Sequence, residues 1–226
     1  MLDEYPPPDY DAIEDRYWKL FNREVPLEAD RRDKRLLKRI DTFVSRFGYP
    51  SEAVLEKIKQ DPMFAAHFAK EPRRMGVHEK EAAKWIEALP WVSEFKNLAN
   101  QGKNAHKVTS DGIIQQLKDV NGKLPGKSLD FRWQTGDTTF WAMHKFTREG
   151  GGNQDSQFKE MLELLQRFSR SRAASICLLV IVDGGYYQAN DAKKLRDLQS
   201  EQREKPPMSY ALPIEEIPEL LIEYSP

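Results

Sequence analysis

A run of seven consecutive apolar residues, Ile176 to Val182, constrains the fold of this chain more than any other feature. It is the longest such run in the sequence, and it is far shorter than the roughly 18 residues that cross a membrane. An unbroken apolar run that ends in Asp183-Gly184-Gly185 is typical of a strand covered on both faces. The sequence therefore predicts an α/β domain with helices packed on either side of this strand.

A β-hairpin is expected before this strand. The segments KSLDFRW and TTFWAMHKF alternate apolar and polar residues, and Gly136 supplies turn chemistry between them. The remaining elements of the second half are a helix over residues 154–170, an exposed helix over 190–205, a short strand over 208–212 and a final helix over 214–224 that contains a proline. A hairpin, a crossover helix and a buried strand together predict an α/β sandwich.

The first half of the chain has helical patterning. Apolar residues recur at helical spacing over residues 9–22 and 33–48, and the second of these segments stops at Gly48. Ser51 is a plausible N-cap for a helix that ends at residue 60, and further helices are expected over residues 79–88 and 92–99. The basic runs RRDKR and KEPRR are candidates for phosphate contact, although such runs are most often solvated faces.

The distribution of charge permits DNA binding even though the net charge is −1. Between Lys96 and Arg148 the chain has nine Lys or Arg against four Asp, a local charge of +5. The acidic, proline-rich N-terminus does not resemble a signal peptide, so we expect a cytoplasmic protein. Cys177 is the only cysteine, which excludes disulfides within the chain and thiolate zinc clusters, and its apolar surroundings predict a buried structural thiol.

The hairpin brings a carboxylate and a lysine together if Gly136 and Asp137 are its central residues. Counting outward then pairs Arg132 with Trp141 and places Asp130 and Lys145 as diagonal neighbours. The residues expected on the face of this pair are Asp130, Arg132, Trp141, Met143 and Lys145. Those expected on the opposite, mostly apolar face are Leu129, Phe131, Trp133, Phe140, Ala142, His144 and Phe146.

An Asp and a Lys on one strand face suit phosphodiester hydrolysis. The carboxylate can hold a hard divalent cation, preferably Mg²⁺, and the lysine can stabilise charge on the attacking water or on the transition state. The alternative for the pair taken alone is a surface salt bridge. The next segment, HKFTREGGGNQDSQ, favours a site, because the helical wheel points Gln154 toward the core and a buried amide needs partners. On the same wheel Glu160 points to solvent, and the alternative for Asn153 and Asp155 is helix capping.

SLDFRW, HKFTREGGGNQDSQ and VIVDGGYY together resemble the core of a type II restriction endonuclease of the PD-(D/E)xK superfamily. This resemblance covers residues 102–187 and implies a central mixed β-sheet flanked by helices, with a helical N-terminal region. It makes Asp130 the metal-binding aspartate and Lys145 the catalytic lysine. The family's second acidic residue lies two positions before the lysine, where this chain has Met143. Either the second carboxylate has migrated, with Asp155, then Glu149, and more weakly Glu94 as candidates, or a backbone carbonyl and water replace the lost ligand.

The same resemblance adds His144, Gln154 and Gln157 to the candidate catalytic residues, with Mg²⁺ as cofactor and Asp130 and Asp155 as its ligands. By strand alternation, however, His144 falls on the apolar face, where a hydrogen-bonded core histidine is the other interpretation. The candidates for phosphate contact are the cations of the basic span, namely Lys103, Lys107, Lys123, Lys127, Arg132 and Arg148.

The expected function is Mg²⁺-dependent, sequence-specific cleavage of double-stranded DNA by a type II restriction enzyme. Cleavage at a palindrome would require a homodimer, and a restriction enzyme would have a cognate DNA methyltransferase. Residues 77–226 would form the catalytic domain, and residues 1–76 a helical region for DNA recognition or dimerisation. The alternatives are a repair or mobile-element nuclease with the same core, and a DNA-binding module whose catalytic site has decayed, which Met143 favours.

Overall fold

The computed structural model describes residues 4–119, 124, 126–149 and 152–225. Lys123, one of the predicted phosphate contacts, lies outside these residues. The chain divides into two compact units, a helical unit of Asp9–His78 and a sheet unit that contains Glu79–Pro226 together with the N-terminal residues up to Pro8. The predicted boundary lay at residues 76 and 77. In the sheet unit, the ring of Tyr5 lies 6.2 Å from that of Trp91, so residues 4–8 pack with the sheet and not with the helical region to which the sequence assigned them.

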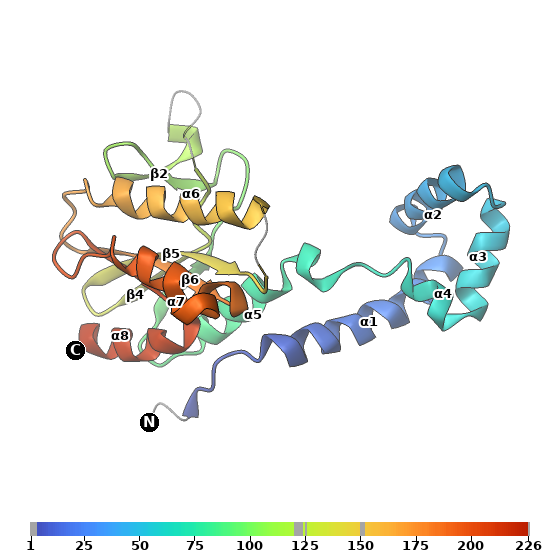
Figure 1. Cartoon of the computed structure of the whole chain (residues 1–226), viewed down its shortest axis with the longest axis horizontal. Helices are drawn as coiled ribbons and strands as arrows, with labels where there is room; N and C mark the ends of the chain where they lie inside the picture. The colour runs from blue at the N-terminus through green and yellow to red at the C-terminus, as the bar shows by residue number, and fades with distance from the viewer. Residues whose placement is uncertain (1–3, 120–123, 125, 150–151, 226) are drawn as a thin grey trace. The chain divides into compact units, whose positions relative to one another are not determined.

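The sheet unit is an α/β structure built on a mixed five-stranded sheet with the strand order β1-β4-β5-β6-β7 (Figure 1). β1, β4 and β5 are antiparallel, whereas β5, β6 and β7 run parallel. Its strands are β1 (Ser93–Asn97), β4 (Phe131–Thr135), β5 (Thr138–Phe146), β6 (Ile176–Asp183) and β7 (Met208–Leu212), and a separate two-stranded sheet pairs β2 (His106–Val108) with β3 (Ile114–Gln116). Its helices are α5 (Val77–Glu87), η3 (Leu117–Asp119), α6 (Gly152–Phe168), α7 (Gly185–Gln199), η4 (Ile214–Glu216) and α8 (Ile217–Tyr224).

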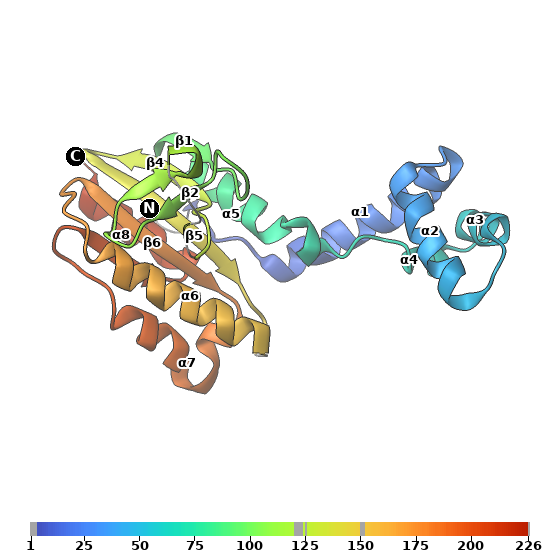
Figure 2. The ribbon, with the colours of Figure 1, turned by 90° about the horizontal axis from the view of Figure 1, so that it is seen from above.

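The sheet separates two hydrophobic cores. On one face, residues of α5, η4 and α8 pack against alternate residues of β4, β5 and β6. On the other face, α6 and α7 cover the intervening residues of β5 and β6 (Figure 2). β6 contributes to both cores, and each residue from Cys177 to Asp183 is buried. The predicted burial of this strand on both faces is therefore confirmed, and so is the burial of Cys177, which raises the pKa of its thiol.

The predicted hairpin register is confirmed over β4 and β5. Arg132 pairs with Trp141 and Gln134 with Thr139. The predicted face of Leu129 is wrong, because Leu129 packs in the core under α6 together with Met143. The reason is that the β4–β5 ladder ends at Phe131, and the backbone N–H of Leu129 donates instead to the carbonyl of His106 in β2. The chain therefore leaves the main sheet at Asp130.

Most helices form where the periodicity predicts them, with several differences. Residues 92–99 were predicted as helix but contain the edge strand β1, which pairs with β4 through a bulge. α7 begins at Gly185, earlier than predicted, and buries Tyr186 and Tyr187. Pro50, not Ser51, is the N-cap of its helix, and Pro218 lies in the first turn of α8, where proline is tolerated, instead of interrupting a helix.

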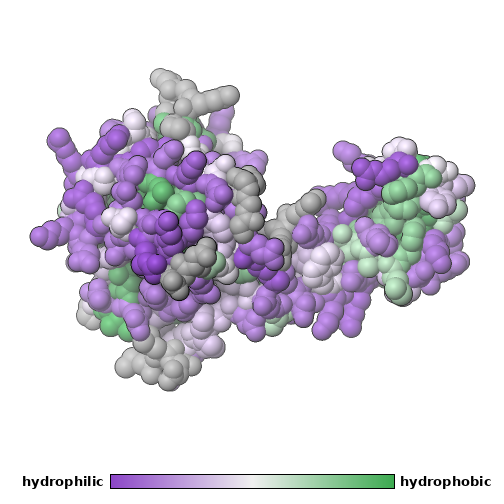
Figure 3. All heavy atoms as spheres, viewed as in Figure 1, coloured by the Kyte–Doolittle hydropathy of each residue, from purple (hydrophilic) through white to green (hydrophobic). Residues whose placement is uncertain are grey.

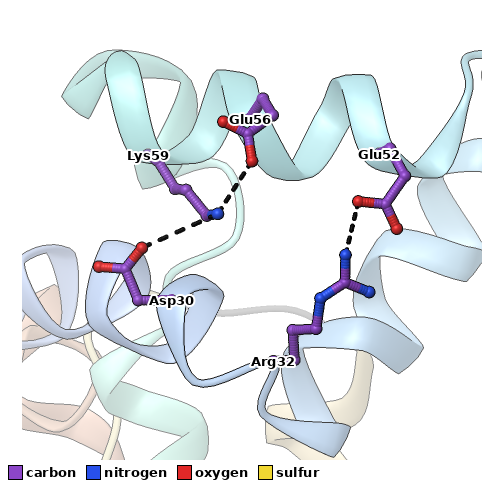
Figure 4. A network of polar contacts seen from close by, with 5 residues as sticks. All are labelled: Asp30, Arg32, Glu52, Glu56 and Lys59. Carbon is purple, nitrogen blue, oxygen red and sulfur yellow. Dashed lines mark hydrogen bonds and ion pairs between the residues drawn. The ribbon is translucent and has the colours of Figure 1, made fainter.

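The helical unit consists of α1 (Tyr10–Asp30), α2 (Lys34–Phe47), α3 (Ser51–Gln60), α4 (Pro62–Ala66) and η2 (Pro72–Met75). Leu36 and Ile40 of α2 pack with Leu55 and Ile58 of α3 in a core of their own. Ion pairs join the helices at the surface, where Arg32 contacts Glu52 of α3, and Lys59 of α3 contacts Asp30 and Glu56 (Figure 4). Figure 3 shows hydrophilic and hydrophobic areas side by side on this unit; its exposed large apolar side chains are Leu20, Leu27, Phe47, Tyr49 and Met63.

Within the part of the chain that the structure describes, no helix has the length and apolar character needed to cross a membrane.

Gly184, which caps α7, offers a test of this packing. Its φ is 95° and its ψ 164°, a region open essentially only to glycine, and a Cβ there would lie 2.4 Å from the carbonyl oxygen of Thr147. We expect Gly184→Ala to lower the free energy of unfolding by at least about 2 kcal/mol. Gly102→Ala is the control, because φ is +77° there but a Cβ would meet nothing within 4 Å, so only about 1 kcal/mol of backbone strain is expected. Urea unfolding followed by tryptophan fluorescence measures both, since Trp18 is the only one of the five tryptophans outside the sheet unit.

Candidate active site

Asp130 lies where β4 and β5 separate. Its backbone still belongs to the sheet, because its N–H donates to the carbonyl of Ala142 and its carbonyl accepts from the N–H of Leu98, both at 2.8 Å. Its side chain turns toward β5, where Oδ2 accepts the backbone N–H of His144 at 2.9 Å. Asp130 is only 9% exposed, so the departure of the chain from the ladder produces a buried carboxylate at a fixed position.

The electrostatic environment of Asp130 favours its neutral form. Burial is the larger cause and the negative charge of Glu79 the second, and together they raise the pKa of Asp130 to about 7. The hydrogen bond from His144 and the charge of Lys145 oppose this rise. Asp130 is therefore poised to lose its proton near neutral pH, and a nearby cation would stabilise the charged form.

Lys145 of β5 is the second predicted residue that the structure brings to this position. Burial lowers the pKa of Lys145, and the neighbouring charge of Lys127 lowers it further. Asp130, Glu160 and Glu79 act in the opposite direction. The charges of Asp130 and Lys145 thus act on one another in the folded protein, where Asp130 is buried and Lys145 is half-buried.

Glu79, in the first turn of α5, is the functional candidate that the sequence analysis missed. Its charge is the one that most raises the pKa of Asp130, and its Oε1 accepts a hydrogen bond of 3.0 Å from the side-chain amide of Asn100. The carbonyl of Asn100 in turn accepts from the hydroxyl of Ser128 at 2.7 Å. Asn100 therefore connects Glu79 with the segment that leads into Asp130. The available signal was a glutamate at the start of a predicted helix, but nothing local indicated which strand it would meet.

His144 is held in the core, as the alternation of β5 predicts. Its Nε2 lies 2.8 Å from Oδ2 of Asp183, and both side chains are buried. The other carboxylate oxygen of Asp183 accepts the backbone N–H of Ile214 at 2.9 Å. The ring of His144 is thus engaged with Asp183, while its backbone N–H binds Asp130. The residue positions Asp130 through its main chain.

Asp155, the first candidate for the missing carboxylate, is engaged with α7. Its Oδ1 accepts from the hydroxyl of Tyr186 at 2.6 Å and lies 3.4 Å from Nζ of Lys194. These contacts hold the pKa of the exposed Asp155 carboxyl below its usual range, with Tyr186 the larger influence. The carboxylate whose charge acts most strongly on Asp130 is Glu79, which lies on α5 and not on α6.

The other candidates occupy varied positions. Glu94 lies on strand β1 and not on a helix, with φ +51°, and its carboxylate is 3.9 Å from Arg132. Glu149 is exposed. Glu160, predicted to point to solvent, is only partly exposed and lies 3.4 Å from Lys127. Gln154 and Gln157 are half-buried, and their side chains form no hydrogen bond with another described residue.

Met143 occupies the position of the family's second acidic residue. It is 4% exposed and packs in the core with Leu129 and with Phe158 and Met161 of α6. A carboxylate at this position would need to be desolvated among apolar side chains. The residue therefore serves packing, and Glu79 lies on the other side of the sheet, where α5 packs.

The predicted phosphate contacts differ in the contacts that their side chains already form within the protein. Lys107 donates to the carbonyls of Leu124 and Gly126, and Lys127 pairs with Glu160. Arg132 lies between Glu94 and the ring of Trp141, with its guanidinium carbon 5.6 Å from the ring centroid. Lys103 is exposed and Arg148 is half-buried.

Comparison of the chain with known protein families and with curated proteins found no match. Among the described residues, no group of three or more His, Cys, Asp or Glu is arranged to hold a metal ion. The burial of Asp130 and the effects of the charges of Lys145 and Glu79 on its pKa are therefore the principal evidence for function.

The raised pKa of Asp130 makes a prediction about stability. Its pKa is higher in the folded protein, at about 7, than the unperturbed value of 3.8, so folding binds a proton between these pH values and stability falls as pH rises through them. In EDTA, Asp130→Asn should be more stable than the wild type at pH 8, by on the order of 2–4 kcal/mol, and the difference should shrink toward pH 4. Thermal unfolding at both pH values measures this.

Asp155→Asn is the control of opposite sign. Because the pKa of Asp155 is lowered, its charged form stabilises the fold, and the substitution should leave the protein no more stable at pH 8. Equal pH dependence of Asp130→Asn and the wild type would contradict the assigned environment of Asp130.

Proposed function

We propose that this protein is a Mg²⁺-dependent endonuclease that hydrolyses double-stranded DNA, with a PD-(D/E)xK core and Asp130 and Lys145 at its active site. The observation that carries the proposal is the interaction of a buried carboxylate of raised pKa with a lysine of lowered pKa at the diverging end of an antiparallel hairpin. Groups with such perturbed pKa values concentrate at catalytic sites. The ordered motifs around the hairpin favour a type II restriction enzyme.

The residues present suit a hard divalent cation. Asp130 and Glu79 supply carboxylate oxygens, which Mg²⁺ prefers, and a positive ion would offset the charge of Glu79 that raises the pKa of Asp130. Asp130 and Glu79 would hold the ion. When bound, Mg²⁺ polarises the scissile phosphate and lowers the pKa of an attacking water.

Lys145 would act on the same phosphate. Its half-buried ammonium, with a lowered pKa, can donate to the attacking water or stabilise negative charge that develops on the phosphoryl oxygens. His144 orients Asp130 through its backbone N–H, and Asn100 orients Glu79 through its amide. The protein thus fixes both carboxylates before substrate binds.

Cleavage of supercoiled plasmid in Mg²⁺ tests the proposal. Asp130→Ala and Lys145→Ala should each reduce the rate by at least about 100-fold, because each removes a group that acts on the transition state. Arg172→Ala, an exposed change outside the site, is the control and should retain full activity. Full activity in either site variant would refute the assignment.

A second comparison identifies the second carboxylate. Glu79→Gln should reduce cleavage about as strongly as Asp130→Ala, by roughly 100-fold or more, whereas Asp155→Asn should remain within a few-fold of wild type. Asn100→Ala, which leaves the carboxylate but removes its donor, should fall between them and require more Mg²⁺ for half-maximal rate. The reverse ranking of Glu79 and Asp155 would restore the α6 carboxylate as the ligand.

A catalytically decayed DNA-binding module is the second candidate, and Met143 is the observation that favours it. Salt-sensitive DNA binding without cleavage in Mg²⁺ or Mn²⁺ would support that alternative. Among active nucleases, discrete fragments from genomic DNA would favour restriction, whereas dependence on a nick, mismatch or end would favour repair or a mobile element. A homodimer and a partner methyltransferase belong to the restriction proposal and are tested with it.

A further inference from the structure

The second helix of the helical unit, α2, has one strongly basic face. Lys34, Arg35, Lys38 and Arg46 are all exposed, and at 100° per residue they fall within about a third of the helix circumference. Exposed Thr42 and Ser45 lie within the same arc, and their hydroxyls bond to carbonyls of the helix itself. Asp41 is the one acidic residue at its margin. We define these six residues, without Asp41, as the basic face of α2.

We propose that the basic face of α2 is a second DNA-binding surface, which contacts the phosphate backbone of a duplex. The proposal takes DNA as the partner from the proposed function, and it adds a surface that the active site does not include. Its consequence is that the helical unit contributes affinity.

Three cations of this face differ from the nearby Arg32 and Arg39 in forming no ion pair with a described residue. Arg32 contacts Glu52 at 2.7 Å (Figure 4), and Arg39 pairs with Glu28. Lys34, Lys38 and Arg46, by contrast, form no ion pair with any residue that the structure describes. Arg35 is a partial exception, because its positive charge helps to lower the pKa of the N-cap residue Asp33. Carboxylates of the helical unit thus already neutralise Arg32 and Arg39, whereas Lys34, Lys38 and Arg46 are not paired with any described residue.

The opposite face of α2 decides between an anionic membrane and a nucleic acid. A helix that binds a membrane surface inserts its apolar face among the lipids. In α2 that face is occupied, because Leu36 and Ile40 are fully buried in the core of the helical unit and Phe43 packs against Phe64 and Phe68. Only the basic face and the exposed terminal residue Phe47 remain for a partner. A row of cations with little apolar surface beside it fits the phosphates of DNA.

The length of the face also fits a duplex. From Lys34 to Arg46 the helix rises about 18 Å, and a duplex carries one phosphate charge per roughly 1.7 Å of its axis, so several phosphates lie within reach of these side chains. Contacts of this kind position a duplex without reading its bases. The face therefore predicts affinity that is strongly salt-dependent and independent of sequence.

The test compares two triple variants of the full chain that remove the same charge from the helical unit. One is Lys34→Ala, Lys38→Ala and Arg46→Ala on the basic face. The other, the matched control, is Lys19→Ala, Arg23→Ala and Lys57→Ala, which are exposed residues on α1 and α3. Binding to a fluorescein-labelled duplex is followed by anisotropy in EDTA, so that no cleavage occurs, between about 50 and 200 mM salt.

We expect the basic-face variant to bind at least about tenfold more weakly than the wild type. Its slope of log affinity against log salt should shrink by about 0.9 for each phosphate that the variant no longer neutralises. The control should bind within about twofold of the wild type. Equal weakening of both variants would reduce the effect to net charge and overturn the proposal. Unchanged binding by the basic-face variant would overturn it, as would a wild type that does not bind the duplex.

The outcome is separable from that of the proposed function. Binding lost in the basic-face variant while the wild type fails to cut plasmid would support this surface and refute the nuclease. Cleavage with unchanged binding in the variant would do the reverse. Circular dichroism and the urea midpoint confirm that both variants are folded. Weakened binding to anionic vesicles, with duplex binding unchanged, would assign the face to lipid and overturn the proposal.

Discussion

The parallel ladder between β5 and β6 is the constraint on which the rest of the sheet unit depends. It pairs eight residues of each strand in one register, so that His144 lies beside Ile181 and Phe146 beside Asp183. That register brings the His144 ring to Asp183, and the backbone of the same histidine then fixes the carboxylate of Asp130. The position of the proposed chemistry therefore follows from backbone pairing in the interior and not from the loops around it.

In the absence of a cation, the ionised form of the proposed site lowers the stability of the folded protein. A buried carboxylate beside a second one disfavours its own ionisation, and the free energy involved is of the same order as a large share of the stability of a typical domain. Such a cost is maintained where function requires it. The lysine and the hydrogen bonds from His144 and Asn100 offset it only in part.

The sequence predicted what depends on local pattern. The position of Gly136-Asp137 set the hairpin register, and the seven apolar residues before Asp183 set the central strand. It did not predict what depends on contacts between distant segments. Leu129 lies on the other face of the sheet because its backbone N–H bonds to β2. The carboxylate of Asp155 accepts a hydrogen bond from Tyr186 of α7. The charge that raises the pKa of Asp130 comes from Glu79, on a helix that packs on the opposite face from α6. Residues 92–99 were assigned to a helix, and their apolar residues Val92, Phe95 and Leu98 do recur at helical spacing, but pairing with β4 selected the strand.

The two oxygens of Asp183 bond to different parts of the sheet unit, one to His144 in β5 and the other to the start of η4, which leads into α8. A screen that scored only catalytic output would therefore assign Asp183 to the chemistry, since its loss would displace His144 and with it Asp130. The same loss would release the backbone N–H of Ile214 inside the core. Loss of Asp183 would then lower activity, as loss of a catalytic residue does, and would also lower stability, as loss of a core residue does. Only activity and unfolding measured together would identify Asp183 as the residue that connects His144 with the start of η4.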